Sequence, residues 1–454
     1  MNLFLPSDPR PVHFVGIAGA GMSALAAVAL QRGVVVTGSD RAPEGAPDLV
    51  RLGARVVQGH EVTAVEGARA LIVSAAIPAD HEEVARARQL GIPVVSRKQA
   101  LAELVAGGRT VGIAGTHGKT TTTVMATEAL AAAGLEPTGL AGGRVASWGG
   151  NARVGGDRLF VVEADEYDQA FLELHPTVAV VNNVEPEHLE CYGHSVAAME
   201  DAFVTFAGRA ETTLVGTEDP GSERVAGRLK NRVWRFGSRG KDLAMETVMV
   251  SATESRAVVR LPGGRRANLT LRVPGFHNLW NATAALGVVV ALEADVDAAL
   301  GALASFTGVG RRFERRGEAA GVTVVDDYAH HATELAVTLA AGRQAFPKRR
   351  LVAVFQPHLF SRTAAQHAAM GRALAAADLA FVTEIYAARE APIPGVSGAQ
   401  VADAAGAVAV YEADRNRLLD RVVKAVRPGD VVFTLGAGDI TGFGPMLLSR
   451  LEAR

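Results

Sequence analysis

The sequence predicts an α/β protein with parallel sheets, built from several successive units. Short runs rich in valine, isoleucine and alanine alternate with helical patterns, which is typical of strand–helix–strand units on a parallel sheet. Two glycine-rich turns, beginning at Gly16 and Gly115, each lie between an apolar run and a helical pattern. The chain has 454 residues, and at about 100–200 residues per domain this length indicates two to four domains.

The first unit extends from Val12 to about Gly107. A helix is expected over Met22–Gln31, directly after the first glycine-rich turn. The expected strands are VHFVGI, VVVTGSD, ARVVQG, ALIVSAAI and PVVSR. Their alternation with helical patterns predicts a parallel sheet.

The second unit begins at Arg109 with the apolar run TVGIAG. A helix is expected after the second glycine-rich turn and should stop at Gly134, because glycine favours helix ends. Two further strands of the buried type follow, LFVVEAD and TVAVVNNV. Between Thr212 and Pro274 no long helix is evident and RANLTLRV alternates, so we expect antiparallel hairpins at the edge of this unit.

The third unit opens near Gly308. Its expected strands are VTVVDDY, RLVAVFQP, LAFVTEIY, VAVYEA and VVFTLGAGD, and they alternate with amphipathic helices such as Glu334–Ala345. The sequence therefore predicts three domains, over residues 1–107, 108–308 and 309–454.

Composition excludes several classes of protein. Lys and Arg total 46 against 48 Asp and Glu, a balance that opposes electrostatic binding of nucleic acid. One cysteine excludes an intramolecular disulfide or a multi-cysteine metal site and fits a reducing compartment. The most apolar run, around Ala284–Leu292, is too short to span a bilayer, and the opening segment has no pattern of a secretion signal. We expect a cytoplasmic protein without a membrane or nucleic-acid partner.

The first glycine-rich turn is a candidate diphosphate site. Backbone N–H groups at a helix N-terminus attract a pyrophosphate, although Ala18 stands where the dinucleotide fingerprint has a glycine. Asp40, at the end of the next expected strand, could accept a hydrogen bond from a ribose hydroxyl. The residues do not separate NAD from another diphosphate such as a UDP-sugar, and the turn could also be purely structural.

The second glycine-rich turn is a candidate triphosphate site. The strict P-loop pattern fails, because Ile113 occupies the position of its first glycine. The chemically active parts are present nevertheless: Gly118 allows close approach of the backbone, Lys119 can reach the β- and γ-phosphates, and Thr120 can bind Mg²⁺. The threonine run that follows is a poor helix start by propensity, which favours a role facing an anion.

Acidic residues end the expected strand LFVVEAD. Four carboxylates occur between Glu163 and Asp168 and repel one another unless a cation or solvent relieves them. Beside a phosphate loop, Mg²⁺ is the economical interpretation, with Glu163 as a ligand; a solvated acidic turn is the alternative. His188 could serve an Mg²⁺ or Mn²⁺ site or be an ordinary loop histidine, and Cys191 is assigned no role.

Ordered motifs then give the sequence a recognisable pattern. GTHGKTTTT, VVEADEYD, NNVEPEHLECYG, GFHNLWNATAA, GVGRRFE, DDYAHHATE, FQPHLFSRT and GAGDI follow the order found in Mur ligases, and the chain most resembles members that add alanine. GIAGAGMS looks like the uridine-diphosphate loop of that family. The resemblance implies a Rossmann-like N-terminal domain, a central P-loop-type ATPase domain with an antiparallel β addition, and a Rossmann-like C-terminal domain.

The resemblance also implies the reaction. L-Alanine would be joined to the lactyl carboxylate of UDP-N-acetylmuramate through an acyl phosphate. The products would be UDP-N-acetylmuramoyl-L-alanine, ADP and phosphate, in the synthesis of peptidoglycan precursors. ATP and Mg²⁺ (or Mn²⁺) would be required, and the protein would be a monomer or a homodimer.

Site residues are implied motif by motif. The ATP site would contain Gly115, Thr116, His117, Gly118, Lys119, Thr120, Thr121, His277, Asn278, Asn281, Arg312 and Tyr328. The UDP-sugar site would contain Gly19, Ala20, Gly21, Met22, Ser39, Asp40 and Ser74. Thr120, Glu163 and His188 would bind metal, His330 and Arg362 would bind alanine, and Lys119, Arg312 and His330 would be catalytic. We expect His330 to position or deprotonate the amine, because imidazole titrates near working pH.

Two other functions are compatible with parts of the sequence. A recycling ligase that adds a tripeptide to UDP-N-acetylmuramate would differ mainly in its C-terminal pocket. A nucleotide-sugar oxidoreductase or sensor would use the first glycine-rich turn alone and would leave GTHGKTTTT and EADEYD unexplained.

Overall fold

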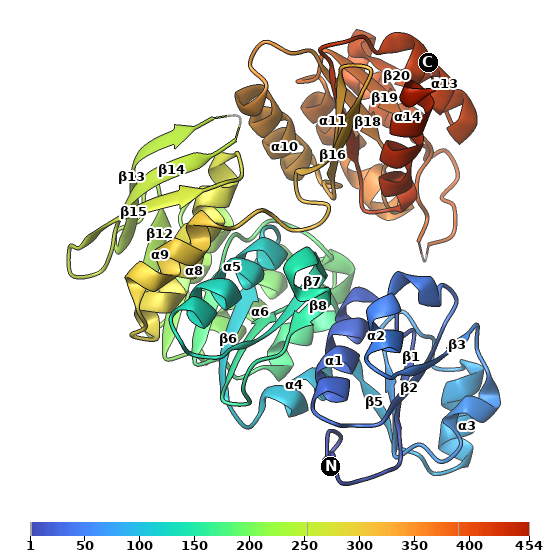
Figure 1. Cartoon of the computed structure of the whole chain (residues 1–454), viewed down its shortest axis with the longest axis vertical. Coiled ribbons are helices and arrows are strands. Elements are labelled where there is room, and N and C mark those ends of the chain that lie inside the picture. Colours follow the sequence, from blue (N-terminus) through green and yellow to red (C-terminus); the bar gives the residue numbers. More distant parts are fainter. Residues whose placement is uncertain (1, 252, 389, 454) are drawn as a thin grey trace. The chain divides into compact units, whose positions relative to one another are not determined.

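The structure is a computed structural model that describes residues 2–251, 253–388 and 390–453. Three sheets follow one another along the chain (Figure 1). None of the described helices is long and apolar enough to cross a membrane.

The first sheet is fully parallel, with strand order β3-β2-β1-β4-β5. Its strands are β1 (Val12–Val15), β2 (Val36–Asp40), β3 (Arg55–Gln58), β4 (Ala70–Val73) and β5 (Val94–Ser96). The helices are α1 (Ala20–Gln31), α2 (Pro47–Arg51), α3 (Glu82–Gln89) and α4 (Arg97–Val105). The predicted parallel sheet is confirmed.

The central sheet has the order β15-β14-β13-β12-β11-β10-β6-β9-β7-β8. Its strands are β6 (Arg109–Ala114), β7 (Thr138–Val145), β8 (Gly150–Arg153), β9 (Leu159–Glu163), β10 (Val178–Val181), β11 (Thr212–Gly216), β12 (Arg232–Gly237), β13 (Leu243–Val250), β14 (Ser255–Arg260) and β15 (Arg266–Leu271). Its helices are α5 (Lys119–Ala132), α6 (Val196–Ala207), α7 (Pro220–Arg228), α8 (Phe276–Ala291) and α9 (Val296–Ala304), with short 3₁₀ turns η4 (Tyr167–Glu173) and η5 (Leu189–Tyr192). Strand β6 is central, so the loop that follows it lies among the ends of β9 and β10.

The prediction for residues 212–274 is wrong in its first half. Strands β11 and β12 pair in parallel, and the helix α7 connects them. The overlooked signal is a helix cap, because the Asp219 side chain accepts a hydrogen bond from the Ser222 N–H at 2.9 Å, just before a proline start. The expected hairpin exists only later: β14 and β15 are neighbours joined by a turn in which the Leu261 N–H donates to the Arg265 carbonyl.

The third sheet has the order β16-β17-β21-β18-β19-β20. Its strands are β16 (Glu314–Ala319), β17 (Val322–Asp327), β18 (Leu351–Phe355), β19 (Leu379–Val382), β20 (Ala409–Tyr411) and β21 (Val431–Leu435). The helices are α10 (Ala332–Ala345), α11 (Phe360–Leu374), α12 (Ala399–Ala405), α13 (Arg415–Ala425) and α14 (Phe443–Glu452). All pairs are parallel except β16 with β17.

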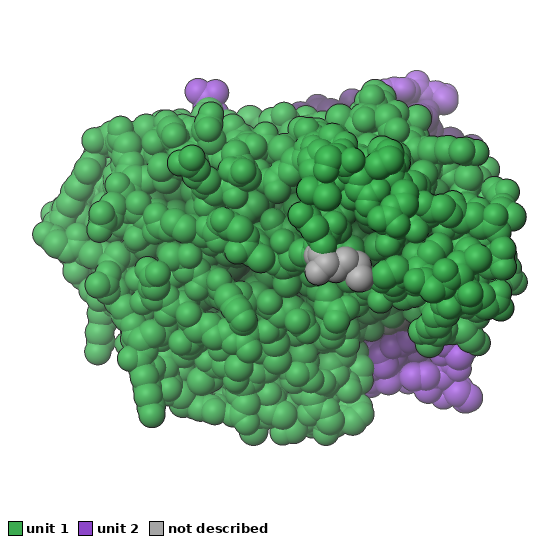
Figure 2. Space-filling model, turned by 90° about the horizontal axis from the view of Figure 1, so that it is seen from below, with its two compact units in different colours: residues 1–248, 256–270, 279–309 green, residues 249–255, 271–278, 310–454 purple. Residues whose placement is uncertain are grey.

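The chain divides into two compact units, coloured in Figure 2. One comprises residues 1–248, 256–270 and 279–309, and the other residues 249–255, 271–278 and 310–454. Within the first unit, α1 packs on β7 and β8, so the first sheet and the central sheet share one apolar core. The two boundaries between the three domains proposed from the sequence therefore stay a prediction.

Candidate active site

The second glycine-rich turn connects β6 to α5. Gly115 and Gly118 have φ values of +132° and +80°, in the region that side chains disfavour. A Cβ on Gly118 would lie 2.5 Å from the Asn281 side-chain oxygen. The turn is held to the end of β10, because the His117 N–H donates to the Asn183 side chain at 2.7 Å and the Glu185 N–H donates to the Thr116 hydroxyl at 2.9 Å. Gly115–Thr121 and Asn281, all predicted to bind ATP, thus lie together.

Lys119 begins α5 and is held over this turn. Its ammonium donates to the Gly115 carbonyl at 2.7 Å and to both Glu166 carboxylate oxygens, at 2.9 and 2.8 Å. Burial opposes the charge on Lys119, but the nearby carboxylates, above all Glu166, outweigh burial and raise the pKa of Lys119. Glu166 itself is 2% exposed. Lys119 therefore stays cationic.

Thr120 and Glu163, both predicted to bind metal, touch each other. The Thr120 hydroxyl donates to a Glu163 carboxylate oxygen at 2.6 Å. A Cβ on Gly142 would come within 2.0 Å of the other Glu163 oxygen, so only glycine leaves room for that carboxylate. A hydroxyl and a carboxylate side by side are oxygen donors of the kind that Mg²⁺ prefers, and the donor set fits that ion.

His188, the third predicted metal ligand, precedes η5. Its backbone is left-handed, with φ of 52°, and its ring makes an edge contact with Tyr167 at 5.0 Å between centroids. The carboxylates of Glu187 and Glu190 lie 3.9 and 3.6 Å from its two ring nitrogens. The histidine therefore lies in an acidic setting.

The first glycine-rich turn connects β1 to α1, with Gly16 at φ +75° and Gly19 at the helix N-terminus. Ala20, Gly21 and Met22 form the first turn of α1, and Ser74, after β4, approaches Gly16. Asp40 accepts hydrogen bonds from the backbone N–H groups of Ala18, at 2.8 Å, and Ala42, at 2.9 Å. The Asp40 carboxylate thus holds the loop itself. Ser39 is fully buried, and its hydroxyl donates to Glu83 at 2.8 Å.

Arg97 connects this loop to the acidic segment. A Cβ on Gly21 would lie 2.7 Å from the Arg97 guanidinium. The same guanidinium pairs with Asp165 at 3.2 Å. Because α4 carries Arg97 to the N-terminus of α1, an arginine far along the sequence lies beside the candidate diphosphate loop.

In the second unit, residues around β17 form a compact group. The guanidinium of Arg312 lies 4.9 Å from the centre of the Tyr328 ring, and that of Arg311 lies 4.7 Å away. Asp327 accepts from the backbone N–H groups of Phe313 and Ala329. Burial raises the pKa of Asp327 to about 6, against the effect of Arg312. Arg312 and Tyr328, both predicted to bind ATP, therefore lie in contact.

His330 and Arg362, which are predicted to bind alanine, both lie next to His358. The Nδ1 atom of His330 lies 2.9 Å from the Tyr328 carbonyl and 3.1 Å from the Glu334 carboxylate. The rings of His330 and His358 are 5.8 Å apart, and the Arg362 guanidinium lies 3.2 Å from the His358 Nδ1. Arg362 is 7% exposed, in the first turn of α11. His330 and Arg362 thus flank one histidine.

The remaining predicted adenine contacts lie on α8. Burial, reinforced by the charge of Arg312, lowers the pKa of His277 to about 4, so its ring is neutral. The Asn278 side chain donates to the Pro274 carbonyl at 2.8 Å and is nearly buried.

The sequence reasoning missed Glu166, Arg97 and His358. Glu166 and His358 lie inside recognised motifs, and Arg97 ends an expected strand. The contacts of Glu166 with Lys119, of Arg97 with Asp165 and of His358 with His330 join segments that meet only in the fold, whereas Arg362 follows His358 by four residues.

A phosphate loop with a half-buried lysine, a hydroxyl–carboxylate pair and a second glycine loop define a multidomain nucleotide-dependent enzyme. The chain belongs to the Mur ligase family, because three family profiles match most of it. They are the Mur ligase family catalytic domain over residues 11–109, the middle domain over 113–289 and the glutamate ligase domain over 311–438. The predicted family and the three-part α/β architecture are confirmed.

Individual relatives narrow this assignment. The chain is 44% identical to a UDP-N-acetylmuramate–L-alanine ligase of Mycobacterium sp. strain JLS, with 99% of this chain and 97% of the relative covered. It is 41% identical to a ligase of the same name from Burkholderia cenocepacia, over 98% and 99% of the two chains. Among solved structures, UDP-N-acetylmuramate-alanine ligase from Thermotoga maritima matches with a TM-score of 0.84 and 29% identity, covering 98% and 99%. A murein peptide ligase from Psychrobacter arcticus shares the fold, with a TM-score of 0.73 and 23% identity over 98% and 99%.

Proposed function

We propose that this chain joins L-alanine to the lactyl carboxylate of UDP-N-acetylmuramate, using ATP and passing through an acyl phosphate. The products are UDP-N-acetylmuramoyl-L-alanine, ADP and phosphate, in the synthesis of peptidoglycan precursors. The observation that carries the proposal is the full-length 44% identity with a ligase of that name. It favours alanine addition over tripeptide recycling, because a second relative of that name also matches the full chain, at 41% identity.

The chemistry requires an activated carboxylate. Direct attack by an amine would have to expel an oxide, whereas a phosphorylated carboxylate loses phosphate readily. Phosphoryl transfer needs positioning and charge neutralisation more than covalent help from the protein. Lys119, held cationic at the N-terminus of α5, is suited to the β- and γ-phosphates, and Arg312 to the transferring phosphoryl group. Loss of one such group costs roughly 10²–10³ in rate at comparable sites.

Thr120, Glu163 and His188 are the residues that would hold Mg²⁺, with Mn²⁺ as an alternative. The ion would supply positive charge beside the phosphate oxygens. The contact of Thr120 with Glu163 and the space left by Gly142 support this assignment.

We assign alanine to the group around His358. Arg362 would pair with the carboxylate of alanine, and His330 would hold or deprotonate its amine. Nδ1 of His330 lies against the Tyr328 carbonyl and Glu334, which leaves Nε2 for the substrate. A His330→Gln variant separates the two roles: a base predicts a changed shape of the kcat–pH profile, whereas pure positioning predicts a higher KM for alanine with an unchanged shape.

Each domain is assigned the binding of one substrate. We assign the UDP-sugar to residues 1–107 through Gly19, Ala20, Gly21, Met22, Ser39, Asp40 and Ser74, ATP to residues 108–308 and alanine to residues 309–454. Adenine would contact His277, Asn278, Asn281 and Tyr328. The enzyme would act in the cytoplasm as a monomer or homodimer, without a nucleic-acid or membrane partner.

Release of phosphate tests the proposal. With ATP and Mg²⁺ present, UDP-N-acetylmuramate and L-alanine are omitted in turn. Sustained release should require both. Release that is independent of the amino acid, or that needs a tripeptide instead, contradicts the proposal.

A further inference from the structure

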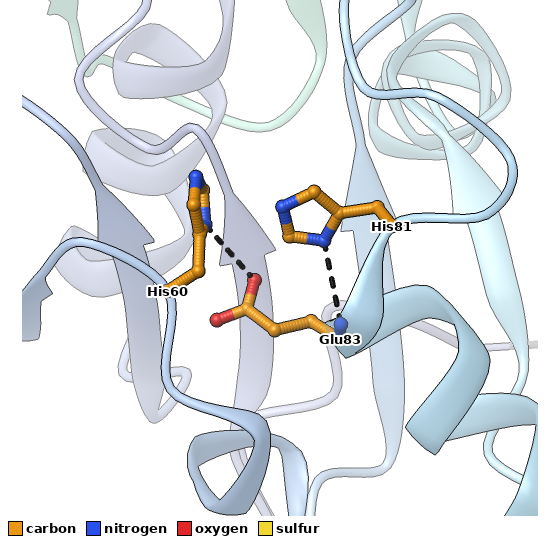
Figure 3. A group of neighbouring side chains, drawn as sticks. All are labelled: His60, His81 and Glu83. Atoms are coloured by element: carbon orange, nitrogen blue, oxygen red, sulfur yellow. Dashed lines mark hydrogen bonds and ion pairs between the residues drawn. The ribbon is translucent and has the colours of Figure 1, made fainter.

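We infer that His60, His81 and Glu83 form a binding site for one divalent transition-metal ion with the preferences of Zn²⁺. The three side chains converge at the carboxyl edge of the first sheet, from the loop after β3 and from the start of α3 (Figure 3). One ligand atom from each of the three residues lies within 4.8 Å of the others. The cluster is separate from Thr120, Glu163 and His188, to which we assign Mg²⁺.

The spacing suits coordination better than hydrogen bonding. Nδ1 of His60 lies 3.6 Å from a Glu83 carboxylate oxygen, which is too long for a hydrogen bond. Two ligands held about 2.0–2.1 Å from a tetrahedral ion lie about 3.3 Å apart, so little movement would be needed. This His60 nitrogen is buried and has no hydrogen-bond partner among the described residues.

His81 contributes the third ligand from the N-terminus of α3. Its ring meets that of His60 edge-on, with centroids 4.3 Å apart. Nδ1 of His81 accepts a hydrogen bond from the Glu83 N–H at 3.3 Å, so this atom carries a lone pair, and coordination through it would replace that long contact.

Glu83 provides the carboxylate of the proposed site. Its side chain is fully buried, and it accepts from the Ser39 hydroxyl at 2.8 Å and from the Glu61 N–H at 3.2 Å. The fully buried His13 places Nε2 3.9 Å from the carboxylate, and this nitrogen also has no hydrogen-bond partner among the described residues. A carboxylate held by surrounding donors is typical of metal ligands, whose orientation depends on such contacts.

The donor set selects the ion. Two imidazoles and one carboxylate match Zn²⁺ and its neighbours in the first transition series, whereas Mg²⁺ prefers oxygen ligands in an octahedron. Water would complete the coordination. Because Glu83 also holds Ser39, a bound ion would fasten the loop after β3 and the start of α3 to β2.

Titration with Co²⁺, a spectroscopic substitute for Zn²⁺, tests the site in the metal-stripped full-length chain. Wild type should bind one equivalent with the intense visible absorption of four-coordinate Co²⁺, and Zn²⁺ should displace it. His60→Gln and His81→Asn should each weaken binding by about tenfold or more and remove the absorption. Glu83→Gln is avoided, because Glu83 also serves Ser39 and Glu61.

Two controls exclude other ligands. His188→Gln and Cys191→Ser should keep the Co²⁺ absorption, which then cannot come from the Mg²⁺ residues or the thiol. Thermal unfolding with a chelator checks that the His60 and His81 variants fold; if His60→Gln does not, the partly exposed His81 decides the test. Weak absorption typical of six-coordinate Co²⁺, or equal binding by wild type and His81→Asn, would overturn the inference.

Discussion

Replacing Glu166 by glutamine should weaken both the fold and the alkaline activity, because it removes the main countercharge of Lys119. The carboxylate lies 2.8 Å from the ammonium. At an effective dielectric constant of about 20, the Coulomb attraction at that distance is roughly 6 kcal/mol. Glutamine keeps the size and one acceptor oxygen, so the net loss should be closer to the about 3–5 kcal/mol found when buried pairs are broken.

The same change predicts a pH dependence. In the wild type the carboxylates hold the pKa of Lys119 above its ordinary value, so the stabilisation is complete below the unfolded pKa and is lost only as the pH rises through the higher folded pKa. Without the Glu166 carboxylate, burial is less opposed, so the pKa of Lys119 should fall in the variant. The Glu166→Gln rate should therefore fall at alkaline pH, where the wild-type rate is still flat.

Tryptophan fluorescence during urea unfolding measures the stability change in the correct unit, because Trp148, Trp234 and Trp280 all belong to the unit that contains Lys119. The matched control is Glu66→Gln, which removes the ion pair between Glu66 and Arg86. Their side chains are 48% and 34% exposed, so this change should alter stability by less than about 1 kcal/mol. If Glu166→Gln unfolds like this control and keeps the wild-type pH–rate profile, the assigned role of the Lys119–Glu166 pair is wrong.

Two further predictions concern the nucleotide residues. Gly118→Ala places a Cβ 2.5 Å from the Asn281 oxygen at a φ of +80°, a strain of about 1–3 kcal/mol that should raise the KM for ATP by about tenfold or more. Gly134→Ala, with φ +81° and nothing within 4 Å, is its control and should leave that KM unchanged; equal effects would refute the explanation. His277 has its pKa lowered to about 4, so wild type should lose up to about 3 kcal/mol of stability relative to His277→Gln as the pH falls from 6.5 to 4. Calorimetry of both proteins measures this difference, and parallel pH curves would contradict it.

Much of the fold could be predicted because apolar strands carry a local signal. β18, LVAVF, is buried on both faces and reads as a continuous apolar run, and β1, VHFV, is apolar except for His13. β16 was missed because its sequence, ERRGEA, is that of a charged edge strand. β7 was missed because TGLAGGRV is rich in glycine, which weakens any strand pattern.

The candidate site, too, could be predicted only in part from the sequence. Lys119 and Thr120 could be identified locally, because a glycine turn before a helix has a recognisable spacing. The partner of Lys119 could not, because Glu166 reaches it only through the pairing of β6 with β9. The contact of His358 with His330 was likewise hidden, since His330 follows β17 and His358 follows β18. Residues within one motif can therefore be identified from the sequence, whereas their charged partners depend on the topology of the fold.

Transfer of oxygen tests the proposed acyl phosphate most directly. UDP-N-acetylmuramate labelled with ¹⁸O in its lactyl carboxylate is turned over with ATP and L-alanine, and the released phosphate is analysed by mass spectrometry. An acyl phosphate predicts one carboxylate oxygen in each phosphate formed. Phosphate that carries no label, while the alanine amide accumulates, would contradict the proposed mechanism.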